Sequence, residues 1–211
     1  MARRVIYIWL VKKLIAHVGG NKIAIIILHE IYGINNFILD ICRQYYTEGY
    51  DVYCPNLLSL EKAFPYSEVE EAYKFFINMV SFEVYKEINN FAYDLKKTYS
   101  KIFIIGFSVG ATIAWKCSEQ ILYDGIICCY GSRIRDYLST NPKCSVLLVF
   151  AKYDSFDVPK TIMQLQCKKN IVLEILDANH GFVDSYSKNY SYSETEMFNK
   201  LRKAFLNNYT K

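Results

Sequence analysis

The sequence has no uncharged apolar run long enough to cross a lipid bilayer, which takes about 20 residues. An apolar stretch near the N-terminus, residues 5–11, stops at Lys12 and Lys13, and no small-residue cleavage site of the kind found in signal peptides follows it. We therefore expect residues 5–11 to form a strand. We also expect a soluble, cytoplasmic protein without a membrane partner.

Signals for nucleic-acid binding and for a metal site are also missing. The formal net charge is only +4, and the 25 basic and 21 acidic residues are dispersed along the chain, so no basic stripe predicts a nucleic-acid partner. The seven cysteines are odd in number, and none of their spacings is typical of a zinc site. Because most of them lie in apolar segments, we expect buried free thiols in a reducing compartment, and we predict neither a metal nor a cofactor.

Length and composition fit a single domain. The chain of 211 residues is 52% hydrophobic, which is enough for one large core, and it has no internal repeat, low-complexity segment or linker. We therefore expect one domain spanning residues 1–211. Nothing in the sequence predicts the oligomeric state.

What the sequence does have is a regular alternation of apolar strands and amphipathic helices. Strands are expected at residues 22–28, 50–54, 102–105, 125–130, 146–150 and 171–176. Helices are expected at residues 36–48, 67–80, 82–99, 111–120, 159–168 and 193–207, with a turn at 17–21 and irregular chain at 56–66. This order predicts an α/β fold, a mostly parallel sheet with helices on both faces, in which ligands bind beyond the carboxyl ends of the strands.

One stretch changes from strand to helix within a few residues. Gly106-Phe107-Ser108-Val109-Gly110 lies between an apolar strand and a helix. Such a sharp corner puts its central residue in a strained conformation, and glycines on either side lack the Cβ atoms that would collide. The pattern predicts a nucleophile elbow, with Ser108 held over a helix N-terminus whose free N–H groups favour an oxyanion. An ordinary glycine-rich turn is the alternative.

An acidic residue and a histidine follow two later strands. Asp154 comes shortly after one of them and His180 shortly after the next. With Ser108 they give the chain order Ser, Asp, His, in which a histidine takes the serine proton and a carboxylate holds the imidazole in one tautomer. Asp157 is an alternative acid, although it could instead cap the helix expected from Pro159.

The other two histidines are weaker candidates for a catalytic base. His17 falls in the expected turn, and we expect His29 to be a strand-end residue that hydrogen-bonds to the backbone. We therefore assign the base role to His180.

Four short segments stand in a fixed order along the chain. They are HEIYGIN at residues 29–35, GFSVG at 106–110, YD at 153–154 and NHGF at 179–182. With this order and spacing, nearly the whole chain resembles the dienelactone hydrolase family of α/β-hydrolases. The resemblance implies an α/β-hydrolase fold with a sheet of eight strands or slightly fewer and no large cap domain. It also implies hydrolysis of an ester or lactone through an acyl-enzyme.

The resemblance further implies roles for three residues near the nucleophile. In that family the glutamate of the first motif, here Glu30, lies beside the nucleophile. The backbone N–H of the next residue, here Ile31, is expected to form the oxyanion hole with the N–H of Val109. Both positions agree with the placement of functional groups at strand carboxyl ends.

Two departures separate the chain from the family. Dienelactone hydrolase itself uses a cysteine nucleophile, whereas this chain has Ser108. The family binds its substrate's carboxylate with arginines, one of them four residues after the histidine, and here that position is Asp184. If Asp184 faces the pocket, it should repel an anionic lactone, so we expect neutral short-chain esters to react faster. Arg133 or Arg135, which follow a strand at the same edge of the sheet, could instead supply the missing cation.

Taken together, the sequence predicts a serine hydrolase that cleaves a small ester, lactone or thioester. Ser108 is the expected nucleophile, His180 the base and Asp154 the acid that orients it. The competing hypothesis is a non-catalytic protein of the same fold that binds a small molecule, and an intact triad argues against it. The natural substrate is not predictable, because the pocket depends on how residues 56–80 fold over the site.

Overall fold

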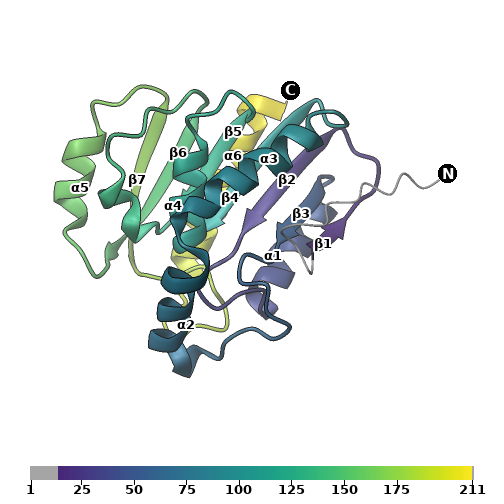
Figure 1. Ribbon diagram of the computed structural model, residues 1–211. Coiled ribbons are helices and arrows are strands. Elements are labelled where there is room, and N and C mark those ends of the chain that lie inside the picture. The colour runs from purple at the N-terminus through teal and green to yellow at the C-terminus, as the bar shows by residue number, and fades with distance from the viewer. Residues whose placement is uncertain (1–13, 211) are drawn as a thin grey trace.

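The computed structural model describes residues 14–210, so the strand expected at residues 5–11 lies outside the described residues. Within this part of the chain, seven strands form one sheet in the order β1-β3-β2-β4-β5-β6-β7 (Figure 1). The strands are β1 (Leu14–His17), β2 (Ile23–Leu28), β3 (Asp51–Pro55), β4 (Lys101–Phe107), β5 (Gly125–Cys129), β6 (Val146–Tyr153) and β7 (Ile171–Asn179). Only β1 pairs antiparallel with its neighbour. The predicted mostly parallel α/β sheet is confirmed.

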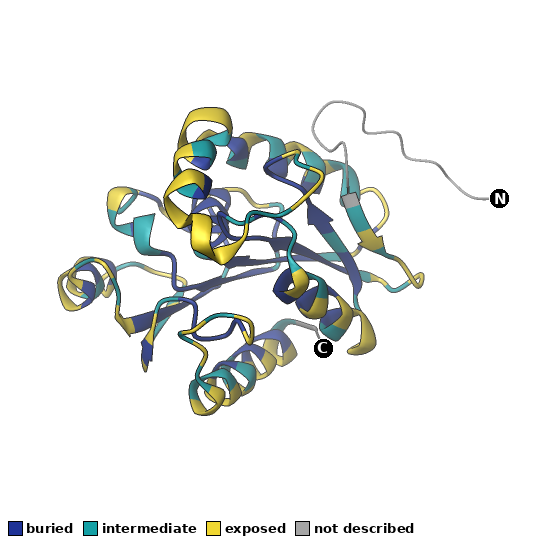
Figure 2. Ribbon diagram, turned by 90° about the horizontal axis from the view of Figure 1, so that it is seen from below, coloured by how far each residue is buried: buried dark blue, intermediate teal, exposed yellow. Residues whose placement is uncertain are grey.

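Helices cover both faces of this sheet, as Figure 2 shows from below. The helices α1 (Asn36–Thr47) and α6 (Tyr192–Thr210) pack on one face, and α3 (Tyr85–Leu95), α4 (Val109–Cys117) and α5 (Val158–Leu165) pack on the other. Shorter helical pieces are η1 (Tyr66–Glu68), α2 (Val69–Phe75), the π-helix η2 (Phe76–Val80), η3 (Phe82–Val84) and η4 (Ser132–Asp136). The helices expected from the sequence are therefore present within a few residues of their expected bounds.

Two expectations about strands need correction. Residues 17–21 are not all a turn, because His17 is the last residue of β1 and pairs with Val52 of β3. A strand of four residues is too short to show a period of its own. The strands β6 and β7 also run further than expected, since they pair with each other as far as Tyr153 and Asn179. This added pairing brings the residues that follow both strands to the same edge of the sheet.

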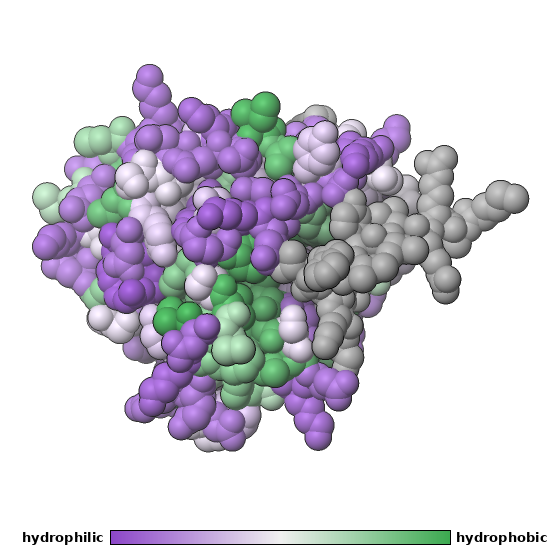
Figure 3. Space-filling model, viewed as in Figure 1, coloured by the Kyte–Doolittle hydropathy of each residue, from purple (hydrophilic) through white to green (hydrophobic). Residues whose placement is uncertain are grey.

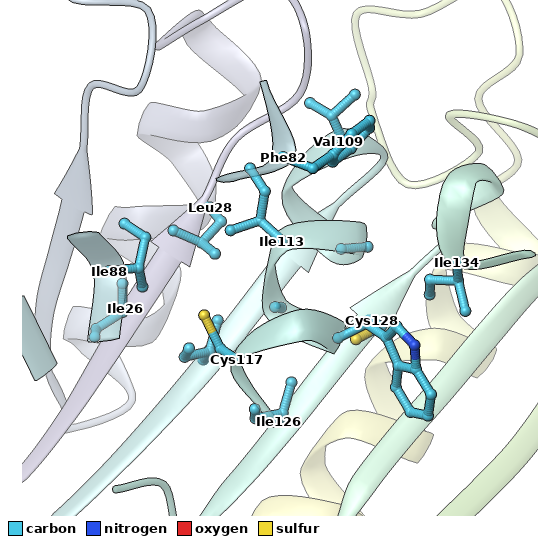
Figure 4. Close-up of a cluster of buried hydrophobic side chains, with 14 of the residues drawn as sticks. Ile26, Leu28, Phe82, Ile88, Val109, Ile113, Cys117, Ile126, Cys128 and Ile134 are labelled. Atoms are coloured by element: carbon cyan, nitrogen blue, oxygen red, sulfur yellow. The ribbon is translucent and has the colours of Figure 1, made fainter. Parts of the chain in front are cut away.

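The central strands fill the core on both faces. Ile26 and Leu28 of β2 pack toward α3 and α4, whereas Ile25 and Ile27 pack toward α1 and α6, as the two-residue period of a strand requires. Figure 4 shows the first of these layers, where Ile113 of α4 lies beside Leu28. A rigid core of this kind holds the strand ends in place, and the strand ends carry the candidate site.

All seven cysteines are free thiols, and six of them are buried. The expected buried thiols are thus confirmed, with the exception of the exposed Cys167. Across residues 14–210 no helix has both the length and the apolar character that crossing a bilayer would need.

The segment between β3 and α3, residues 56–84, extends past the sheet and carries α2. In Figure 1 α2 projects from the lower edge of the molecule, near the loop that follows β7. Figure 3 shows hydrophilic side chains over α2 and apolar side chains gathered between α2 and α1. We call residues 56–80 the cover segment, because four of its residues line the pocket described below.

Candidate active site

Ser108 lies at the corner between β4 and α4, where its backbone is strained. Its dihedral angles are φ 54° and ψ −115°, a left-handed conformation that costs a non-glycine residue roughly 1–3 kcal/mol. A Cβ atom at Gly106 would lie 2.3 Å from the carbonyl oxygen of Gly110, and one at Gly110 would lie 2.2 Å from that of Leu28. Glycine is therefore required at both positions, as a nucleophile elbow demands.

Three side chains form one hydrogen-bonded chain at the carboxyl edge of the sheet. His180 Nε2 lies 2.9 Å from Ser108 Oγ, and His180 Nδ1 lies 2.7 Å from Asp154 Oδ2. Asp154 directly follows β6, and His180 directly follows β7. The fold thus brings together Ser108 and His180, which are 72 positions apart in the sequence.

The proton positions in this chain follow from the carboxylate, which only accepts hydrogen bonds. Asp154 Oδ1 accepts the Ser155 amide at 2.6 Å, while Oδ2 accepts from His180 Nδ1–H. In the neutral imidazole Nε2 then carries no proton, and it accepts from the Ser108 hydroxyl. This is the tautomer that a base for Ser108 needs.

Electrostatics tune both members of the His–Asp pair. Burial lowers the pKa of His180, but the hydrogen bond and the charge of Asp154 outweigh it, so the pKa of His180 lies above its ordinary value. Burial also favours neutral Asp154, but the hydrogen bond from His180 holds the pKa of Asp154 below its usual range. At neutral pH Asp154 is therefore ionised and stabilises positive charge on the imidazole.

Ile31 and Val109 both line the pocket that contains Ser108. Val109 is the first residue of α4, so its N–H has no partner within the helix. Within residues 14–210 neither N–H has a hydrogen-bond acceptor. Backbone N–H groups without an acceptor are the donors that an oxyanion hole uses.

Glu30 is a carboxylate buried next to this triad, with only 5% of its surface exposed. Burial raises the pKa of Glu30 to about 7, which the positive charge of His180 partly opposes. The Tyr130 ring lies beside this carboxylate, with its centroid 4.9 Å from that of the His180 ring, and its interaction with Glu30 slightly lowers the pKa of Glu30. Glu30 is therefore partly ionised near neutral pH, and the negative charge of its ionised form helps to raise the pKa of His180.

The weaker candidates lie outside the triad. His29 Nδ1 donates to the Glu30 carbonyl at 2.7 Å and Nε2 accepts the Leu57 amide at 2.9 Å, so His29 is a backbone-bonded strand-end residue, as predicted. Burial lowers the pKa of His29 to about 4, which keeps it neutral. Asp157 is the N-cap of α5 and accepts the Lys160 amide at 2.9 Å. Its expected alternative role as a helix cap is therefore confirmed.

The triad opens into a pocket of about 900 Å³. One wall belongs to the cover segment, which contributes Tyr66, Ser67, Val69 and Tyr73. Arg133 and Arg135 from η4 and Asp184 from the loop after β7 also line the pocket. The three residues whose charge the sequence predicted to affect substrate preference thus all line the pocket.

Tyr66 joins three segments around the pocket, and the sequence carried no signal for it. Its hydroxyl donates to Asp184 Oδ2 at 2.5 Å and accepts from the Asn35 side-chain amide at 3.0 Å. Asn35 is the N-cap of α1, just after the loop that carries Ile31. Tyr130 was missed as well, although its place directly after β5 at the carboxyl edge of the sheet would have drawn attention to it.

The sheet order, the strained serine between β4 and α4 and the Ser, Asp, His arrangement define an α/β-hydrolase. Within that class the chain belongs to the dienelactone hydrolase family, whose family model matches residues 13–210. The predicted family membership and fold are confirmed, and they support a hydrolase activity for the chain.

Individual proteins and solved structures are similar to the chain over most of its length. The chain is 42% identical over 167 residues to the uncharacterized protein YczH of Bacillus subtilis (strain 168), covering 77% of this chain and 82% of that protein. A crystal structure described as "Putative Dienelactone Hydrolase" from Klebsiella pneumoniae superimposes with a TM-score of 0.72 at 19% identity, covering 87% of this chain and 85% of that one. A dienelactone hydrolase-like promiscuous phosphotriesterase, P91, from metagenomic libraries has a TM-score of 0.68 at 14% identity, covering 90% and 88% of the two chains. At these identities the two solved structures show similarity of fold.

Proposed function

We propose that the protein is a serine hydrolase that cleaves a small carboxylic ester, lactone or thioester through an acyl-enzyme. The observation that carries the proposal is the unbroken hydrogen-bonded chain from Asp154 through His180 to Ser108, with distances of 2.7 and 2.9 Å. A binding protein would have no need for a strained serine in contact with an oriented base.

The proposed reaction begins when Ser108 Oγ attacks the substrate carbonyl carbon and gives its proton to His180 Nε2. The carbonyl oxygen becomes an oxyanion, which accepts hydrogen bonds from the N–H groups of Ile31 and Val109. As the tetrahedral intermediate collapses, the bond to the leaving alcohol or thiol breaks, and His180 protonates that group. Asp154 keeps the imidazole in the required tautomer and stabilises its charge throughout.

Hydrolysis of the acyl-enzyme repeats the same steps with water as the nucleophile. His180 takes a proton from the water, the oxyanion forms again in the same place, and Ser108 leaves as the alcohol after regaining a proton. The chain needs no cofactor for this sequence of steps. The free cysteine thiols support the further proposal that the protein works in the reducing cytoplasm.

Labelling with a fluorophosphonate probe tests the proposal directly. We expect wild-type protein to be labelled at Ser108 and to hydrolyse 4-nitrophenyl acetate, and Ser108→Ala to lose both properties, with a loss of at least about 10³-fold in kcat/KM. Ser67→Ala is a matched control, because this second serine also lines the pocket and, among the described residues, is hydrogen-bonded to neither Asp154 nor His180. Labelling that persists in Ser108→Ala would contradict the assignment, and a folded wild-type protein that neither labels nor turns over any ester would favour the non-catalytic binding protein. A panel of esters with varied acyl length would then define the substrate range.

A further inference from the structure

The apolar surface of the pocket is mainly aromatic, and all of its aromatic rings apart from that of His180 belong to tyrosines. They come from the loop after β2, the cover segment, the end of β6 and the loop after β7, and they are Tyr32, Tyr66, Tyr73, Tyr153 and Tyr186. The described residues of the lining include no phenylalanine, and its aliphatic side chains are Ile31, Val69 and Val109. Phenylalanines instead fill both layers of the core. A tyrosine can offer its ring to a ligand while its hydroxyl bonds to the protein or to water.

Two of these rings form a pair beside the loop that carries Ile31. The ring centroids of Tyr32 and Tyr66 lie 4.8 Å apart, with the ring planes at 65° in an edge-to-face arrangement. Tyr32 directly follows Ile31, whose N–H is one of the two proposed oxyanion donors. The Tyr66 hydroxyl donates to Asp184 and accepts from the Asn35 amide, yet Tyr66 remains 37% exposed. The protein therefore holds the Tyr66 ring in place through its hydroxyl and leaves part of the ring open to the pocket.

The charged side chains of the pocket lining balance one another. Three of them are acidic and three are basic, and they are Glu30, Asp154, Asp184, Arg133, Arg135 and Lys188. An equal number of charges of each sign gives the pocket no excess that would favour an ionic ligand. Burial raises the pKa of Tyr32 and of Tyr66, so both phenols stay protonated and neutral. The tyrosine pair is thus a neutral aromatic surface in a pocket of balanced charge.

We propose that Tyr32 and Tyr66 are specificity-determining residues that bind an uncharged aromatic ring of the substrate next to the scissile bond. A substrate ring packed against this pair would extend its edge-to-face arrangement, which aromatic rings prefer over contact with a saturated ring of the same size. The pocket has room for such a ring, because its volume of about 900 Å³ is far larger than a short-chain ester needs. The inference rests on the proposed hydrolase function and names its substrate class, an ester or thioester with an aryl group.

The test compares neutral esters of similar size that differ in having an aromatic or a saturated ring. One pair, ethyl phenylacetate and ethyl cyclohexylacetate, carries the ring on the acyl side. The other pair, benzyl acetate and cyclohexylmethyl acetate, carries it on the alcohol side. A pH-stat follows acid release, and the quantity measured is the ratio of kcat/KM for the aromatic ester to that for its saturated partner. Because the intrinsic reactivities are the same for every variant, they cancel when the ratio in a variant is divided by the ratio in wild type.

We expect the ratio for one of the two pairs to fall at least about fivefold in both Tyr32→Leu and Tyr66→Leu. Tyr32→Phe keeps the ring and should keep the ratio within about twofold of wild type. Tyr93→Leu is the matched control, since Tyr93 is an exposed tyrosine of α3 that does not line the pocket, and its ratio should also stay within about twofold. In wild type, benzamide should inhibit ethyl acetate hydrolysis with a Ki at least about threefold below that of cyclohexanecarboxamide.

Ratios for both pairs that are equal in wild type, Tyr32→Leu and Tyr66→Leu would overturn the proposal, as would an equal fall in Tyr93→Leu. Failure of the underlying hydrolase function would look different, because wild type would then hydrolyse neither member of either pair, or Ser108→Ala would hydrolyse them as fast as wild type. Circular dichroism and thermal unfolding check that a changed ratio comes from folded protein. If the leucine variants do not fold, the inhibitor comparison in wild type decides, and a Ki for cyclohexanecarboxamide equal to or below that for benzamide overturns the proposal.

Discussion

Replacing Asp154 by Asn tests the triad most sharply, because the two side chains have nearly the same shape. Asp154 Oδ1 accepts hydrogen bonds from the Ser155 amide at 2.6 Å and from the Ser155 hydroxyl at 3.2 Å. In Asp154→Asn the amide oxygen should take this position, since only the oxygen accepts from both donors. The amide NH₂ group would then face His180 Nδ1.

This reversal changes the tautomer of His180. An NH₂ donor favours unprotonated Nδ1, so the proton moves to Nε2, which then cannot accept the proton of Ser108. Loss of the correct tautomer alone should lower kcat by about 10³- to 10⁴-fold, which corresponds to a barrier higher by roughly 4–5.5 kcal/mol. Losing the Asp154 charge should also lower the pKa of His180, which that charge now raises. The rising limb of kcat/KM against pH should therefore move to lower pH in the mutant.

Steady-state hydrolysis of a neutral 4-nitrophenyl ester between pH 5 and 9 measures both effects. Asp157→Asn is the matched control, because Asp157 caps α5 through the Lys160 amide and Asn caps a helix as well as Asp does. We expect this control to keep its pH profile and to lose less than about twofold in kcat/KM. The reasoning would be refuted if Asp154→Asn kept more than a tenth of wild-type activity, or if the two mutants ranked in the opposite order.

Three further substitutions probe the surroundings of the triad. Glu30→Gln should remove a pH-dependent loss of stability. A carboxyl whose pKa rises to about 7 on folding lowers the free energy of unfolding by roughly 3 kcal/mol as pH rises from below 4.5 to above 7. Urea unfolding at both ends of this range should show a smaller decrease in the free energy of unfolding in the mutant than in wild type. Gly110→Ala puts a Cβ atom 2.2 Å from the Leu28 carbonyl oxygen, so the melting temperature of this mutant should fall by roughly 6 °C or more. An unchanged melting temperature would exclude this close approach. Tyr66→Phe leaves Asp184 Oδ2 without its donor and should raise KM more than it lowers kcat in steady-state assays, whereas a pure loss of kcat would place Tyr66 in the chemical step.

The sequence predicted those parts of the site that depend on local pattern. Gly106 and Gly110 are dictated by backbone contacts within a single strand-turn-helix unit, so five consecutive residues carry the signal. The positions of Asp154 and His180 follow from topology, because residues after parallel strands meet at one edge of the sheet. The length of β6 and β7 could not be predicted, since it depends on pairing between the two strands and not on the apolar pattern of either one.

The contacts of the residues that line the pocket could not be predicted, for a different physical reason. Tyr66 and Asp184 are 118 positions apart, and their hydrogen bond depends on where the cover segment places η1 relative to the loop after β7. From the sequence alone, Asp184 is expected to be an exposed carboxylate that repels anions. In the folded chain this carboxylate is buried and accepts hydrogen bonds from the Tyr66 hydroxyl and the Tyr186 amide. Likewise Arg133 and Arg135 look equivalent in sequence, whereas in the structure Arg133 pairs with Asp136 and Arg135 contacts the Ser132 carbonyl and the Phe156 ring. We therefore expect that exchanging the cover segment alters substrate selectivity while leaving the triad distances unchanged.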